Sequence, residues 1–242
     1  MKLISLNCEA QKHLDLIVPF LQQQKPDVFC FQEIFVDDFE MLKNVLGMDG
    51  FHVPIAKIIE PNQFGIEPKG LWGVGILSKL PFASQHSAYY KGIAENIPAY
   101  VDGQPNSLNR ALAWATITND GEEFTVATTH FTWSMGGEST PEQMRDLAAL
   151  QEILNTIPEF VLCGDFNAPR GRATFDTLAA KYTDNIPASV TSTLDPNLHR
   201  VKGKALMIDV LFTTPEFIAK DVEVICGVSD HCAVKAEIDR KS

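Results

Sequence analysis

The chain has 242 residues, 45% of them hydrophobic, and its 31 acidic and 20 basic side chains give a formal net charge of −11. No linker-like or low-complexity stretch divides it, so a single domain over residues 1–242 is expected. The negative charge argues against stable binding of long duplex DNA, because proteins that grip duplex DNA neutralise several phosphates with lysine and arginine.

Strands and helices are both predicted in the first eighty residues. In chain order the expected elements are a strand over 3–7, a helix over 13–24, a strand over 28–31, a short helix over 41–46, and strands over 51–59 and 73–78. The first helix is indicated by Leu14, Ile17, Val18 and Leu21, which recur at helical spacing before Pro26. A loop rich in glycine and proline fills residues 60–72.

The rest of the chain is dominated by strands. A hairpin is predicted over 110–118 and 123–129, and the clearest helix spans 141–154, with Thr140 as its cap and Pro141 in its first turn. Further strands are expected over 160–163, 207–213, 222–226 and 232–238. Many strands with few helices predict an α/β fold of two mixed β-sheets packed face to face with helices outside.

Polar side chains recur where the predicted strands end. In chain order they are Asn7, Glu33, His130, Asp165 and Asn167. Polar groups at the ends of buried strands are costly unless they converge on something charged. Asp230 and His231 follow a later strand and add a carboxylate and a titratable ring. The combination favours metal-assisted hydrolysis of a phosphate ester.

Six motifs carry a resemblance to a known family. They are Asn7, Gln32-Glu33, Thr129-His130, Gly164-Asp165-Phe166-Asn167, Ile208-Asp209-Val210-Leu211-Phe212 and Ser229-Asp230-His231. With these motifs in this order, the chain resembles the endonuclease/exonuclease/phosphatase superfamily from residue 3 to residue 238. Each motif alone is weak, but six in the family's order are specific. The resemblance implies a four-layered α/β sandwich.

The resemblance also implies a metal centre and a water-activating group. Glu33 is expected to be the main metal ligand, with Asn7 beside it, and such oxygen ligands suit Mg²⁺ or Mn²⁺. Asp165 is expected to position or deprotonate the attacking water. Asn167 is expected to donate its amide to a phosphate oxygen.

The histidines of the motifs are expected to meet the phosphate. His231 would bind or protonate it, with Asp209 holding the ring. Asp230 would orient this loop or add a carboxylate to the metal site, and His130 would be a second donor to the phosphate or the leaving group. The resemblance leaves open whether Asp165 or His231 acts as the base.

Side chains outside the motifs are weaker candidates for substrate contact. Arg110 either pairs with phosphate or forms a structural salt bridge, and Trp133 either stacks on substrate or packs. Arg170 is placed to meet an anionic substrate, and the basic run 199–204 either touches substrate or is a solvated loop. Surface or packing positions are expected for the remaining histidines, His13, His52 and His86.

The cysteine pattern favours a reducing compartment. The five cysteines are Cys8, Cys30, Cys163, Cys226 and Cys232. An odd number without a C-x-x-C motif is typical of reduced, packed thiols and argues against a zinc site. No signal-peptide pattern or apolar run of membrane-spanning length is present. A cytoplasmic monomer without a transmembrane segment is therefore expected.

The sequence thus predicts a divalent-metal-dependent phosphohydrolase, with a phosphodiesterase favoured. Within the family, loops set the substrate. A nuclease for short or single-stranded nucleic-acid ends, a small-molecule phosphodiesterase and a lipid phosphodiesterase stay open. The alternative from another class is an inactive binding scaffold, which would be expected to lack some of the motif residues that are all present here.

Overall fold

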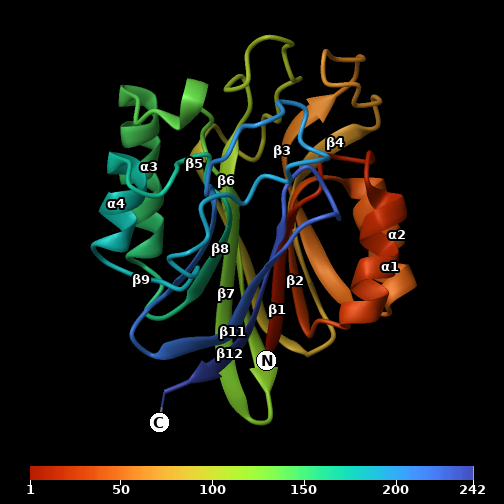
Figure 1. Cartoon of the computed structure of the whole chain (residues 1–242). Coiled ribbons are helices and arrows are strands. Elements are labelled where there is room, and N and C mark those ends of the chain that lie inside the picture. The colour runs from red at the N-terminus through yellow and green to blue at the C-terminus, as the bar shows by residue number, and fades with distance from the viewer. Residues whose placement is uncertain (242) are drawn as a thin grey trace.

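Two six-stranded sheets form the centre of the protein in the computed structural model, which describes residues 1–241 (Figure 1). The first sheet has the order β11-β12-β1-β2-β4-β3, with β1 (Lys2–Asn7), β2 (Val28–Phe35), β3 (Asp49–Ile58), β4 (Gly70–Ser78), β11 (Phe217–Ile225) and β12 (Ala233–Arg240). The second has the order β5-β6-β7-β8-β10-β9, with β5 (Phe82–Lys91), β6 (Arg110–Asn119), β7 (Glu122–His130), β8 (Val161–Asp165), β9 (Thr183–Asp184) and β10 (Asp209–Thr213).

Helices cover the outer face of each sheet (Figure 1). One side carries α1 (Leu14–Gln24) and α2 (Val36–Leu46), and the other carries α3 (Pro141–Leu154) and α4 (Ala173–Ala179). A short 3₁₀ turn, η1 (Met135–Gly137), precedes α3. The predicted four-layered α/β sandwich is confirmed. Within residues 1–241, no helix is both long and apolar enough to cross a membrane.

The apolar strands are buried on both faces, which explains their continuous hydrophobic runs. In β2, Val28 and Cys30 belong to the core between the sheets, whereas Phe29 and Phe31 pack with residues of α1 and α2. All four side chains are fully buried. The strand therefore holds both helices and the facing sheet in place around the site at its end.

Most of the predicted elements are present, and the differences have local causes. The helix at Pro141–Leu154 begins as expected, with the Thr140 side chain accepting a hydrogen bond from the Gln143 amide. Helix α2 starts at Val36, directly after β2 and five residues before the prediction. The prediction missed β5, which lies at the edge of its sheet with most residues exposed or half-buried, so it lacks an apolar run. It also missed the seven-residue α4.

The ends of the central strands meet at one edge of the sandwich. Strands β1 and β2 run parallel, as do β7 and β8, while β10 and β12 run antiparallel to their neighbours and begin where those strands end. The register pairs His130 with Asp165, and Asp165 with Asp209. This topology brings residues far apart in the sequence into one site.

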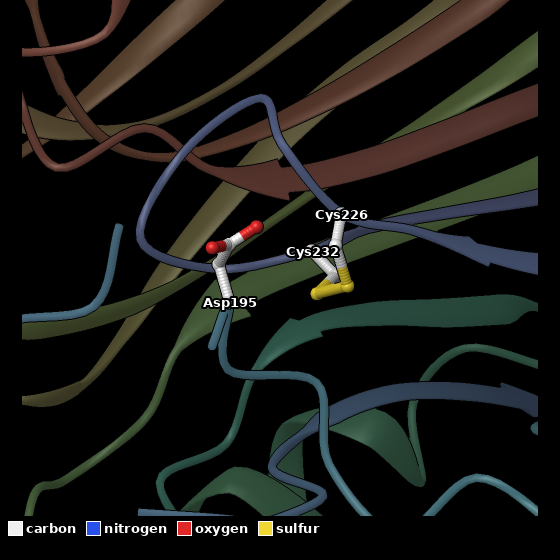
Figure 2. Close-up of side chains that lie close together, drawn as sticks. All are labelled: Asp195, Cys226 and Cys232. Atoms are coloured by element: carbon white, nitrogen blue, oxygen red, sulfur yellow. A yellow bond between two sulfur atoms is a disulfide. The ribbon is translucent and has the colours of Figure 1, made fainter. Parts of the chain in front are cut away.

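The cysteine prediction is wrong for two of the five residues. Cys226 and Cys232 form a disulfide that closes the loop before β12, and Figure 2 shows it beside Asp195. The Asp195 carboxylate accepts a hydrogen bond from the Gly227 amide at 2.6 Å. The other three cysteines are free and buried, as expected. Because disulfides persist mainly in oxidising compartments, the pairing removes part of the basis for a cytoplasmic location, which stays a prediction.

Candidate active site

Three motif residues from both sheets form the floor of the site. The Asn7 side-chain amide donates to Glu33 Oε1 at 3.1 Å and to Asp165 Oδ2 at 3.0 Å. The amide oxygen of Asn7 accepts from the Glu9 backbone at 3.1 Å. In this arrangement Asn7 holds the two carboxylates beside each other, and its expected role as a metal ligand stays a prediction.

The backbone departs from regular strand geometry at the residues that carry the chemistry. Glu33 lies at a bulge in the pairing of β2 with β4 and has a φ of +58°, and Asn167 has a φ of +49°. Non-glycine residues rarely adopt this region, and such strain concentrates at functional sites. Gly164 has a φ of +132°, and a Cβ there would lie 2.2 Å from the Thr129 carbonyl oxygen. Glycine therefore allows β7 and β8 to approach closely just before Asp165.

His231 and Asp209 form a buried pair. His231 Nδ1 lies 2.8 Å from Asp209 Oδ2, and its Nε2 lies 3.8 Å from Asp165 Oδ2. Burial lowers the pKa of His231, but the carboxylates of Asp209 and Asp165 outweigh burial and raise it well above its ordinary value. The surroundings therefore favour the cationic form of the ring, with one nitrogen fixed by Asp209 and the other near Asp165.

His130 is the second histidine of the site, and its surroundings favour the neutral ring. Its Nε2 lies 3.5 Å from Glu33 Oε1 and 3.6 Å from Asp165 Oδ2. Burial lowers the pKa of His130 well below its ordinary value, and the nearby Arg110 cation adds to the effect. These close approaches are therefore not ion pairs, because desolvation of the ring outweighs the two carboxylates. The Trp72 ring meets the imidazole edge to face at 5.7 Å.

A network behind the floor fixes Asn167. Its backbone amide donates to Asp165 Oδ1 at 2.8 Å, and its side chain donates to the Phe131 carbonyl at 3.2 Å. The buried Gln143 of α3 donates to the Asn167 carbonyl at 3.2 Å. Asn167 thus lies next to Asp165, as the motif predicts, and its proposed contact with phosphate stays a prediction.

Sequence reasoning missed Glu9, a buried carboxylate of the cavity wall. Glu9 accepts hydrogen bonds from Lys12 at 2.5 Å and from His13 at 2.9 Å. These bonds outweigh burial and lower the pKa of Glu9. His13, for which a surface or packing position is expected, is half-buried and paired with Glu9. The spacing of i, i+3 and i+4 was a usable signal. Glu9, His13 and Asp230 also lie within ligand distance of one another.

The floor carboxylates Glu33 and Asp165, with His130 beside them, fit a hard divalent cation. Glu33, His130 and Asp165 each offer a ligand atom within 4.8 Å of one another. Burial, with the Asp230 carboxylate, raises the pKa of Glu33 to about 7. Burial also raises the pKa of Asp165 to about 6, although the His231 cation opposes it. Carboxylates crowded in this way repel one another, and oxygen donors of this type suit Mg²⁺ or Mn²⁺.

A cavity of about 390 Å³ opens above this floor. Its lining includes Trp133 and Arg110, two of the predicted substrate contacts. The Arg110 side chain is buried and donates to the His130 carbonyl at 3.1 Å and to Asn106 Oδ1 at 3.3 Å. Arg110 forms no salt bridge with any residue in the range 1–241, so the salt-bridge alternative is wrong.

Arg170 does not belong to this cavity. Its guanidinium pairs with Asp184 at 2.6 Å and donates to the Ile186 carbonyl at 2.7 Å. These contacts hold the 184–190 segment and occupy the guanidinium donors, and the predicted substrate contact of Arg170 stays a prediction. The basic run divides: His199, Arg200 and Lys204 line the cavity, while the exposed Lys202 donates to the Asn197 carbonyl.

Comparison with known proteins identifies the family. The model of the endonuclease/exonuclease/phosphatase family matches residues 4–231. Nocturnin of Drosophila melanogaster is 32% identical over 168 residues, which are 68% of this chain and 25% of that protein, so the chain spans about a quarter of this relative.

Solved structures share the fold over the whole chain. The human Nocturnin catalytic domain with bound sulfate anion superposes with a TM-score of 0.74 at 17% identity, covering 100% of this chain and 93% of that one. A family protein from Bacteroides thetaiotaomicron gives a TM-score of 0.74 at 17% identity, covering 100% and 98%. Because the family model spans nearly all of the sequence, this chain belongs to the endonuclease/exonuclease/phosphatase family of phosphoric ester hydrolases.

Proposed function

We propose that the protein is a divalent-metal-dependent phosphodiesterase that hydrolyses a small phosphate ester by attack of water. One observation carries the proposal. Asp165 belongs both to the candidate metal group with Glu33 and His130 and to the buried group with Asp209 and His231. A carboxylate floor, a histidine cation and a carboxylate shared between them therefore face one cavity.

The cavity supports a substrate of small-molecule size. Ligand pockets for small molecules typically span roughly 300–1,000 Å³, and this one is about 390 Å³. Its aromatic lining also accommodates a nucleobase, so short or single-stranded nucleic-acid ends are the second candidate. Trp133 is the side chain from the sequence analysis that would stack on such a base.

The positions of the side chains suggest a role in the reaction for each of them. A divalent cation held by Glu33 and its neighbours would stabilise charge on the phosphate oxygens. Asp165 would accept the proton of the attacking water, because its two neighbours, Asn7 and the Asn167 amide, fix its carboxylate. His231 would bind the phosphate or protonate the leaving oxygen through Nε2, since Asp209 already occupies Nδ1.

The decisive experiment is hydrolysis of bis-p-nitrophenyl phosphate with Mg²⁺ or Mn²⁺, with and without a chelator. We expect chelation to abolish activity, added metal to restore it, and Glu33→Gln to be nearly inactive while folded. Glu223→Gln removes a half-exposed carboxylate of β11 that pairs with Lys235, and serves as the matched control. Full activity in excess chelator would refute the metal-dependent mechanism. A faster rate on p-nitrophenyl phosphate would reassign the enzyme as a phosphomonoesterase.

A further inference from the structure

Two cations on one side of the cavity have no acidic partner. Arg200 and Lys204 both line the cavity that contains Asp165 and His231. Neither forms an ion pair with a carboxylate in the part of the chain that the structure describes, although acidic residues outnumber basic ones by 31 to 20. Arg200 is exposed and Lys204 is half-buried. For Lys204, partial removal from water without a partner costs free energy unless an anion meets the ammonium.

Each of the two cations is placed by its surroundings. The Arg200 guanidinium lies over the Phe64 ring, 4.2 Å from its centroid, which ties the 195–208 loop to the 59–69 loop. Lys204 is half-buried. Burial and the Arg200 cation lower the pKa of the Lys204 ammonium, and Asp165 partly opposes them. Lys204 is therefore partly removed from water, and the Asp165 carboxylate acts on its charge.

Trp72 and Tyr100, which we call the aromatic wall of the cavity, offer further hydrogen-bond donors. Trp72 is 5% exposed and its indole Nε1 has no hydrogen-bond partner within residues 1–241. The Tyr100 hydroxyl is also buried without a partner among those residues. Both side chains line the cavity. A buried donor left unpaired is unusual, and a ligand rich in acceptor oxygens would satisfy it.

Hydrogen bonds to the backbone fix the segments that carry this wall. Lys57 donates its amide to the Pro98 carbonyl at 2.8 Å, and Tyr100 donates its amide to the Lys57 carbonyl at 2.8 Å. Asn62 Oδ1 accepts from the amides of Phe64 at 3.0 Å and Ile66 at 3.3 Å. The aromatic and apolar surface is therefore held at a fixed place in the cavity lining.

We propose that Arg200 and Lys204 form a second anion-binding subsite, so that the substrate is a phosphate ester with a flat or apolar body and a second phosphate or carboxylate. The reacting phosphate would lie on the floor, the body against Trp72 and Tyr100, and the second anion between the two cations. This inference rests on the proposed hydrolase function, and it names the substrate class of the same site.

A pair of chromogenic diesters tests the subsite. The probes are thymidine 5′-(p-nitrophenyl phosphate) and the same compound with a 3′-phosphate, which differ only in the second anion. We expect the 3′-phosphorylated compound to be preferred in kcat/KM. Arg200→Gln and Lys204→Gln should each raise its KM by about tenfold to a hundredfold, the size of a charge-assisted hydrogen bond, and change the singly anionic probe less than twofold.

Controls separate the subsite from the catalytic proposal. Lys202→Gln, in the same loop but outside the cavity lining, should leave both probes unchanged. Arg200→Lys should recover part of the preference, and melting curves check that each variant is folded. The subsite would be overturned if the wild-type enzyme had equal KM values for both probes, or if the variants lost activity equally on both. In either case hydrolysis of bis-p-nitrophenyl phosphate would continue. If the wild-type enzyme did not hydrolyse bis-p-nitrophenyl phosphate at all, the proposed function itself would be overturned.

Discussion

The pairing of His231 with Asp209 predicts how two substitutions combine. Both side chains are buried, and Nδ1 and Oδ2 are 2.8 Å apart. A positioned acid or base contributes about 10²–10⁴-fold in rate, which is roughly 3–5 kcal/mol of barrier. We therefore expect His231→Ala to lower turnover by this order with little change in KM. Asp209→Asn should cost less, because the ring stays in place without its charged partner.

The double variant and the pH profile separate positioning from simple structural damage. The double variant should be no slower than His231→Ala, because residues that act as one unit are not additive. In the wild type, activity that needs the His231 cation is lost as pH rises through its raised pKa. Asp209→Asn removes a cause of that raised pKa, so the alkaline limb of kcat/KM should move to lower pH.

The assay is steady-state hydrolysis of bis-p-nitrophenyl phosphate across pH, with melting temperatures for every variant. Asp239→Asn is the matched control, since it makes the same chemical change in a surface carboxylate that pairs with Lys220. Losses that add in the double variant, together with an unmoved alkaline limb, would show that Asp209 does not act through His231.

Three further predictions concern stability and binding. Reduction of the Cys226–Cys232 disulfide, or replacement of both cysteines by serine, should cost about 2 kcal/mol of unfolding free energy for so short a loop. The measured melting temperature should then fall by about 4–8 °C, and an unchanged value would contradict this. Burial lowers the pKa of His52 to about 4. Between roughly pH 6.5 and 4 the His52 ring is therefore protonated in the unfolded chain but not in the folded one. Stability should fall by about 3 kcal/mol as pH drops through that window. Denaturant unfolding should show a flatter profile for His52→Gln and an unchanged one for the exposed His86→Gln. Long duplex DNA should bind weakly and with strong salt dependence in filter binding, and a tight, salt-tolerant complex would show that net charge is a poor guide here.

The sequence predicts the floor of the site because backbone topology determines it. Asn7 and Asp165 end the apolar strands β1 and β8, and Glu33 lies near the end of β2. Parallel strands that end at one edge bring such residues together whatever the loops do. His231 joins them because it lies just before β12, which begins beside the end of β1. The register of β10 then places Asp209 beside Asp165. These relations need only the order of the strands and the positions at which they end.

The wall of the cavity could not be predicted in the same way. Arg170 and Arg200 look alike in the sequence, each being an arginine in a polar loop. Arg170 forms an ion pair with Asp184, whereas Arg200 stacks on Phe64, which is 136 positions away in the sequence. The Cys226–Cys232 pairing escaped prediction for the same reason, since an odd count of cysteines does not show which two loop positions approach each other.

The charges of the floor and of Arg200 and Lys204 together explain how an acidic protein would accept an anionic substrate. Glu33, Asp165 and Asp230 repel a phosphate unless a divalent cation neutralises them, and burial strengthens this repulsion. In the proposed subsite, Arg200 and Lys204 would attract an anion without any metal. A substrate with two anionic groups would then be held first by these two cations and would reach the floor only in the presence of the divalent cation. A substrate with one anionic group would gain nothing from these two cations, so its affinity should depend more steeply on the divalent cation.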